Sequence, residues 1–224
     1  MTQLAAPPPV AERVLLPRSL RPVVTVVVAV CVATLVGLSV WLANTSGPTR
    51  LELPLVHLQA PRDAVPLVWK VGVGLGSAAF VWFGIAAMAL WGAVQRQWTR
   101  AAAVLAIPGT VWMVEYVLKP VIDRETVGWR PTPCFPSGTA AGVAALVAVF
   151  FVLALPYTRS KSARLMLLGG CAAIMLYNGV AIVLSGRHYP LDVVGGIAVG
   201  MSVVLLWCRL LDHLSAPQLA LSPD

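Results

Sequence analysis

The chain has 224 residues, of which 58% are hydrophobic and only 11% are charged, and its formal net charge is +7. A mean hydropathy of +0.83 excludes an ordinary soluble domain and indicates a membrane protein. The cations are scattered among loops without a basic run, so the positive charge does not indicate binding to nucleic acid.

Six apolar segments approach the roughly 20 residues that a membrane-spanning helix requires. In chain order they are Val23–Ala43, Val71–Val94, Ala101–Leu118, Gly138–Leu155, Leu165–Leu184 and Val193–Leu211. We therefore expect an all-α fold, a polytopic membrane protein with a bundle of six transmembrane helices. The membrane domain is expected to cover residues 22–214, with cytoplasmic tails at 1–21 and 215–224.

The first segment also has features of a secretory signal peptide, since three arginines precede it and small residues follow it. It is longer than the apolar region of about 7–15 residues that such peptides carry. This length favours an uncleaved first helix.

The distribution of cations predicts the orientation in the membrane. With both termini inside, nine cations are cytoplasmic: Arg13, Arg18, Arg21, Arg96, Arg100, Arg159, Lys161, Arg164 and Arg209. Seven are outside: Arg50, Arg62, Lys70, Lys119, Arg124, Arg130 and Arg187. Lys119, Arg124 and Arg187 are candidates for a chemical role, as described below. Without them, nine cytoplasmic cations stand against four outside, which favours this orientation. In this orientation the polar motifs described below, around Lys119, Ser137 and His188, face the extracytoplasmic side of the cell membrane.

The longest outside loop, residues 45–70, carries six ionisable side chains among prolines: Arg50, Glu52, His57, Arg62, Asp63 and Lys70. We interpret it as an interfacial loop that covers the helices. Selection of a substrate headgroup is the alternative.

The four cysteines do not form a disulfide framework. Cys31, Cys171 and Cys208 lie in apolar segments, where a free cysteine behaves as a small hydrophobe. Cys134 lies in a polar loop with no second cysteine or base nearby in sequence, which disfavours a nucleophilic role. No Cys or His residues have the spacing of metal ligands, so no metal site is predicted.

Lys119 and Arg124 follow the third apolar segment. A phosphate at a membrane boundary requires neutralising charge, and the planar guanidinium of Arg binds two oxygens at once. The alternative is that these cations extend from a helix end to the interface. Glu115 lies four residues before Lys119, so the two can pair. That pair either compensates charge within the helix or orients Lys119.

Pro136-Ser-Gly-Thr139 opens the fourth segment. The start of a helix presents unpaired N–H groups and a positive dipole end, and a glycine there allows an anion close to the backbone. Pro, Ser and Gly are also common in plain helix caps.

His188 and Asp192 lie four residues apart at the predicted start of the sixth helix, with Arg187 adjacent. An Asp that binds one imidazole nitrogen fixes the tautomer and leaves the other nitrogen free to attack. Ionisable groups are expensive at a membrane boundary, which favours a functional role. Together with the cations upstream, this pair indicates phosphoryl chemistry at a membrane surface.

As a set, these motifs resemble the PAP2 (type 2 phosphatidic acid phosphatase) superfamily of integral membrane lipid phosphatases. That family shows Lys…Arg-Pro, then Pro-Ser-Gly-His, then Ser-Arg…His…Asp. The matching residues, in the same order and spacing, are Lys119, Pro136-Ser-Gly138 and His188-Tyr-Pro-x-Asp192, followed by Gly195-Gly196.

The resemblance implies a lipid phosphatase in which His188 attacks phosphorus and forms a phosphohistidine, which water then hydrolyses. It implies that Asp192 orients His188 and that no metal or other cofactor takes part. The residues expected to bind the substrate phosphate are Lys119, Arg124, Ser137, Gly138, Thr139 and Arg187. The expected partners are the lipid phosphate and the bilayer.

Two arginines of the family pattern are absent. The third-motif Arg, expected six residues before the nucleophile, is Ile182, and Arg187 is the candidate replacement. The first-motif Arg falls on Thr126, which Arg124 and Arg130 flank.

The histidine of the second motif is Thr139 here. In the family that His protonates the leaving alkoxide, and a Thr hydroxyl is a poor proton donor near neutral pH. General acid catalysis contributes about 10²–10⁴-fold, most of all for a poor leaving group. Its loss favours a substrate that leaves without a proton, such as a polyprenyl diphosphate. The alternatives are a catalytically impaired PAP2-fold protein that binds lipid phosphates or supports a partner, and a protein that transfers the phosphoryl group.

Overall fold

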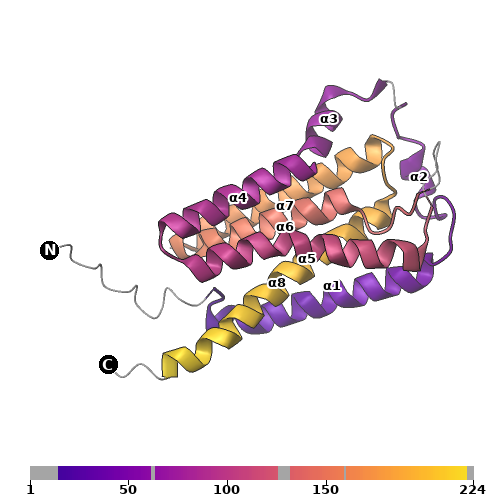
Figure 1. The fold of residues 1–224 in the computed structure, drawn as a ribbon. Helices are drawn as coiled ribbons and strands as arrows, with labels where there is room; N and C mark the ends of the chain where they lie inside the picture. Colours follow the sequence, from indigo (N-terminus) through magenta and orange to yellow (C-terminus); the bar gives the residue numbers. More distant parts are fainter. Residues whose placement is uncertain (1–14, 62–63, 126–131, 159, 221–224) are drawn as a thin grey trace.

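Helices dominate the computed structural model, which describes residues 15–61, 64–125, 132–158 and 160–220 (Figure 1). The α-helices are α1 (Arg21–Leu42), α2 (Leu53–Val56), α3 (Leu67–Gly74), α4 (Ala78–Val94), α5 (Trp98–Ile122), α6 (Gly138–Ala154), α7 (Lys161–Leu184) and α8 (Pro190–Ala220). Two 3-10 turns, η2 (Arg18–Leu20) and η4 (Leu155–Tyr157), precede α1 and follow α6. The ranges described contain isolated β-bridges but no strand, and the predicted all-α class is confirmed.

Among the described residues, five helices are long and apolar enough to cross a membrane: α1, α5, α6, α7 and α8. α3 and α4 meet the same criteria only as a pair, and they are bent by 48° relative to each other. When this bent pair is counted as one span, the chain has the six spans that the sequence predicts.

The second span differs from the prediction of an uninterrupted helix over Val71–Val94. The chain forms two helices here because Ser77 starts a new one, its hydroxyl accepting the Phe80 N–H at 3.3 Å. The glycines before Ser77 also lower the propensity for a continuous helix. One of them, Gly76, lies so close to α6 that an added Cβ would overlap the backbone oxygen of Thr139. The break therefore brings the backbone of the second span against the start of α6.

The other spans contain most or all of the predicted apolar segments, but several of these helices extend beyond the segments by a few residues. α5 runs on past Pro120, α7 begins after the N-cap Ser160, and α8 begins at Pro190. At its other end α8 continues to Ala220, into the segment 215–224 that we expected to be a tail.

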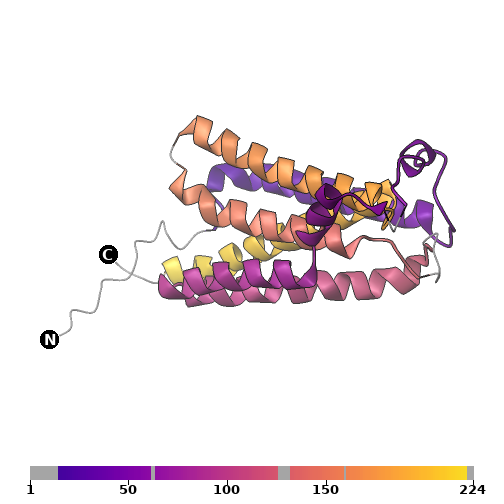
Figure 2. The same cartoon turned by 90° about the horizontal axis from the view of Figure 1, so that it is seen from above.

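α6 and α8 lie side by side (Figures 1 and 2). Gly196 and Gly200 face α6 so closely that a Cβ on either would overlap a backbone oxygen, that of Ser137 or of Ala141. Small residues four apart permit this close approach. In addition, the Ser137 N–H donates a hydrogen bond of 2.9 Å to the carbonyl oxygen of Asp192. The first turns of α6 and α8 are therefore fixed to each other.

The two ends of the bundle carry different polar groups. At one end Asp212 accepts the backbone N–H groups of residues 15 and 16 at 2.7 and 3.1 Å. At the opposite end lie the connections 43–61, 132–137 and 185–189 (Figure 1). All three polar motifs of the sequence are at this second end.

Candidate active site

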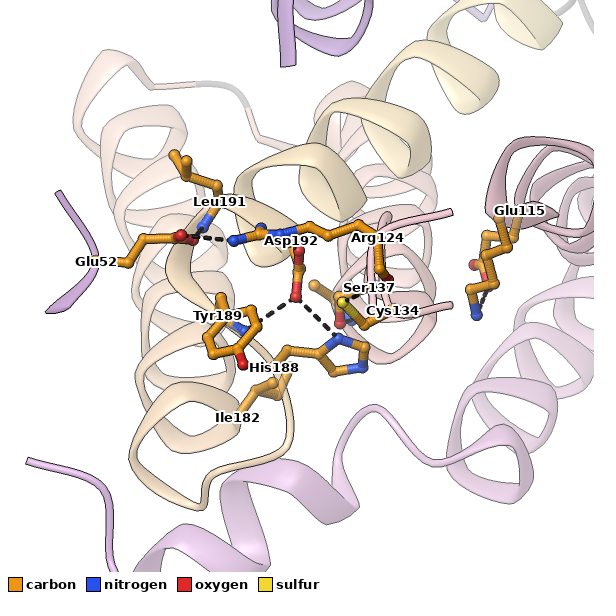
Figure 3. Close-up of polar contacts among 12 residues, drawn as sticks. Glu52, Glu115, Arg124, Cys134, Ser137, Ile182, His188, Tyr189, Leu191 and Asp192 are labelled. Carbon is orange, nitrogen blue, oxygen red and sulfur yellow. Dashed lines mark hydrogen bonds and ion pairs between the residues drawn. The ribbon is translucent and has the colours of Figure 1, made fainter. Parts of the chain in front are cut away.

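His188 lies in the turn between α7 and α8, and Asp192 in the first turn of α8. Oδ2 of Asp192 is 3.5 Å from Nδ1 of His188 and accepts the Tyr189 N–H at 3.0 Å. The Asp192 side chain is fully buried, whereas that of His188 is 17% exposed. The second imidazole nitrogen points away from Asp192 (Figure 3). The structure therefore brings the predicted pair together and leaves one ring nitrogen available.

Arg124, predicted as a phosphate ligand, is fully buried between two carboxylates. Its Nη1 donates to Oδ1 of Asp192 and its Nη2 to Oε2 of Glu52, both at 2.5 Å (Figure 3). The guanidinium also lies over the Tyr189 ring, 4.8 Å from its centroid. Burial lowers the pKa of Arg124, but the carboxylates of Asp192 and Glu52 outweigh that effect and raise it. The side chain thus holds Asp192 and is enclosed by protein.

Glu52 is the residue that the sequence analysis missed. It directly precedes α2 and is only 1% exposed, although it comes from the loop that we interpreted as interfacial. Besides Arg124, its carboxylate accepts the Leu191 N–H at 2.9 Å and the Thr49 N–H at 2.7 Å. Glu52 therefore joins the connection 43–61 to the start of α8 and to the arginine that holds Asp192.

Ser137 caps α6, because its buried hydroxyl accepts the Ala140 N–H at 3.4 Å. The N–H groups of Gly138 and Thr139, in the first turn, have no acceptor within the helix. They form the positive end of the α6 dipole, where an anion is stabilised.

Lys119 and Glu115 lie one turn apart near the end of α5, with Nζ and Oε2 separated by 3.5 Å. Both line a cavity of about 260 Å³ between α4, α5 and α6, and Gly138 and Thr139 form another of its walls. The remaining walls are apolar or small, with the indole rings of Trp82 and Trp112 among them. This cavity has a charged end beside the start of α6 and an apolar remainder, which suits a lipid phosphate.

Arg187 lies elsewhere, in a second cavity of about 230 Å³ that it shares with His188, Gln59 and other residues of the connection 43–61. Ile182, at the position of the missing family arginine, is fully buried among apolar side chains. Five of the predicted site residues therefore line the two cavities, which share no lining residue. Lys119, Gly138 and Thr139 line the first, and Arg187 and His188 line the second.

Cys134 is buried, and its thiol donates to the carbonyl oxygen of Arg124 at 3.1 Å. Burial raises the pKa of this thiol, so it stays protonated and is a poor nucleophile. Thr126 and Arg130, named in the analysis of the first motif, lie outside the described residues. Within the described part of the chain, no three His, Cys, Asp or Glu side chains are grouped as a metal ion requires.

Comparison with known proteins gives a consistent result. Residues 112–215 match the sequence model of the PAP2 superfamily. Phosphatidylglycerophosphatase B of Bacillus subtilis is 26% identical over 160 residues, which cover 68% of this chain and 70% of that protein. The crystal structure of a transmembrane PAP2 type phosphatidylglycerolphosphate phosphatase from Bacillus subtilis has a TM-score of 0.62 at 19% identity, covering 84% of this chain and 96% of that one. The resemblance drawn from the motifs is thereby confirmed, and the likeness to the solved structure shows the fold.

Proposed function

We propose that this chain is a membrane lipid phosphatase with His188 as its nucleophile, since residues 112–215 match the sequence model of the PAP2 superfamily. The observation that carries this proposal is the His188–Asp192 pair, fixed by Arg124 from behind and set beside the start of α6. The pair has one imidazole nitrogen directed away from Asp192, as a nucleophile requires.

In the first step Nε2 of His188 donates its electron pair to phosphorus, and the bond from phosphorus to the leaving oxygen breaks. Nδ1 keeps its proton and faces Asp192, which orients the ring and stabilises the positive charge that forms on it. In the second step a water oxygen bonds to phosphorus, the P–N bond breaks, and His188 is restored as phosphate leaves.

Three groups are positioned to hold the phosphoryl oxygens. Lys119, Gly138 and Thr139 line the first cavity, and Arg187 lines the second together with His188. Cations and helix-start dipoles stabilise the charge of the transition state. Ser137 contributes by capping α6. We assign Arg124 to the positioning of Asp192, since its guanidinium already binds two buried carboxylates.

The substrate class depends on the leaving group. When a diphosphate is cleaved, the leaving group is a phosphate, which departs without being protonated. Thr139 in place of the family histidine therefore favours a polyprenyl diphosphate. The names of both Bacillus proteins refer to phosphatidylglycerophosphate, which is a phosphate monoester of a lipid. Such a monoester leaves as an alkoxide and requires a proton donor other than Thr139.

We place the site on the extracytoplasmic face, supported by the nine-to-four distribution of cations in the sequence and by the position of all three motifs at one end of the bundle.

Phosphate release by the purified protein tests the function, with a panel of lipid monophosphates and diphosphates and with His188→Ala as the control. Release that depends on His188 supports the phosphatase. If the protein binds lipid phosphates but releases phosphate from none of them, the phosphatase function is overturned. That result would favour the impaired PAP2-fold protein, which is also supported by Thr139 and Ile182 in place of the family histidine and arginine.

A further inference from the structure

Glu115 is a charged side chain for which the phosphatase mechanism gives no role. Its side chain is 7% exposed, and it lies deep in the cavity that holds Lys119, the proposed phosphate ligand. Its carboxylate also contacts the start of α6, since a Cβ on Gly138 would overlap Oε2 of Glu115. A carboxylate here faces the same two groups, Lys119 and the α6 dipole, that are expected to bind the substrate phosphate.

Short contacts connect Glu115 to the start of α6, and through it to the backbone of Asp192. Gly138, which Glu115 contacts, is the neighbour of Ser137, and Ser137 binds the backbone of Asp192. Thr139, at the place of the missing family histidine, lines the same cavity as Glu115. The carboxylate therefore lies beside the position from which the family donates its proton.

We propose that Glu115 is the general acid of this enzyme and replaces the histidine that Thr139 lacks; this proposal rests on the phosphatase function proposed above. It extends the substrate range to lipid monophosphates, whose alkoxide leaving group requires a proton.

Binding of substrate supplies the reason for Glu115 to carry a proton. In the free protein its carboxylate pairs with Lys119 at 3.5 Å. Among the described residues lining the cavity from α4, α5 and α6, Lys119 is the sole cation and Glu115 the sole acid. A bound phosphate takes Lys119 as its partner, which leaves two anions in an apolar cavity with one cation. Uptake of a proton by the carboxylate removes this cost.

The proton then completes both steps. As the N–P bond to His188 forms and the P–O bond breaks, the carboxylic acid of Glu115 gives its proton to the leaving alkoxide. In the second step the Glu115 carboxylate takes a proton from the attacking water, whose oxygen bonds to phosphorus as the P–N bond breaks. Glu115 ends the cycle protonated, as it began it, and loses the proton when phosphate departs from Lys119.

Two substrates that differ in their leaving group test the proposal. The leaving group of octyl phosphate is an alkoxide, which requires a proton. The leaving group of nitrophenyl phosphate is a stabilised phenolate, which departs without one. Glu115→Gln should lower kcat on octyl phosphate by about 100-fold or more and on nitrophenyl phosphate by about threefold or less. Adding Thr139→His to Glu115→Gln should restore much of the octyl phosphate activity. Glu125→Gln, an exposed acid at the same end of the bundle, is the matched control and should change neither rate.

An equal loss on both substrates would overturn the proposal and leave Glu115 as a charge partner of Lys119. If Glu115→Gln does not fold, pH profiles of the unmodified protein decide. The rate on octyl phosphate should fall at high pH, as the acid loses its proton, while the rate on nitrophenyl phosphate should not, and identical profiles would refute the acid. If the unmodified protein hydrolyses neither substrate, or His188→Ala hydrolyses both, the failure lies with the phosphatase function itself.

Discussion

Glu52→Gln is the most informative change outside the motifs, because it removes one buried charge and keeps the size of the side chain. Glu52 and Arg124 are both at most 1% exposed, and their side chains are 2.5 Å apart. Breaking a buried ion pair costs about 3–5 kcal/mol when the remaining charge loses its partner. Arg124 keeps Asp192 as a second partner, so we expect the lower end, about 3 kcal/mol.

The new amide also brings an NH₂ group toward N–H donors. Glu52 accepts from Arg124, Leu191 and Thr49, and an amide offers only one oxygen for these three groups. We expect the melting temperature in detergent to fall by about 6–12 °C, which is the shift that about 3 kcal/mol produces in a domain of this size.

The activity of Glu52→Gln separates a positioning role from a purely structural one. Because Arg124 holds the carboxylate that orients His188, kcat on a lipid phosphate should fall by about tenfold or more, while KM changes little. Phosphate release measured well below the melting temperature gives both constants, with Glu125→Gln as the control. An unchanged kcat in a destabilised Glu52→Gln protein would refute the positioning role and leave Glu52 as an anchor of the loop.

The remaining predictions concern the nucleophile, the topology and the buried thiol. His188→Ala should abolish phosphate release in a folded protein, and activity within about tenfold of the original would rule out a phosphohistidine. Asp192→Asn should cost less, because the imidazole stays in place. An impermeant thiol reagent added to intact cells should label Glu125→Cys and not Ser162→Cys, with the unsubstituted chain as the blank, and the reverse pattern would move the site to the cytoplasmic face. In the folded protein Cys134 should resist alkylation up to about pH 9, since burial raises its pKa, and mass spectrometry showing rapid modification at pH 8 would contradict this.

The features predicted well from sequence are those with a local origin. A transmembrane helix is recognised by the length of an apolar run, and the His188–Asp192 pair by its spacing of four residues across the start of α8. Gly196 and Gly200, four residues apart in α8, likewise permit close packing, which α6 provides. In each case the interacting groups are fixed by helix geometry alone.

The features that were missed depend on contacts between distant parts of the chain. Glu52 meets Arg124 across 72 residues and Leu191 across 139, and no periodicity relates these positions. A sequence signal did exist, since Glu52 is a single acid within the apolar run Leu51–Val56. It was not used because five other ionisable residues in the same loop suggested a polar surface. Arg124 was assigned to phosphate for a related reason, because its type and place suit an anion and sequence does not reveal that two carboxylates already occupy it.

The charges of this network explain why Arg124 needs two carboxylates. With Asp192 alone, the buried arginine would form a neutral pair and would cancel the charge that His188 requires. Glu52 adds a second negative charge, so Glu52, Arg124 and Asp192 together carry one net negative charge beside His188. In the proposed mechanism, formation of the N–P bond turns the imidazole into a cation, and the net negative charge of the other three side chains compensates it. Groups fixed before reaction stabilise this developing charge without reorganisation. We therefore expect Glu52 to act on the proposed nucleophile through Arg124 and Asp192, and removal of its charge to slow the step in which the proposed phosphohistidine forms.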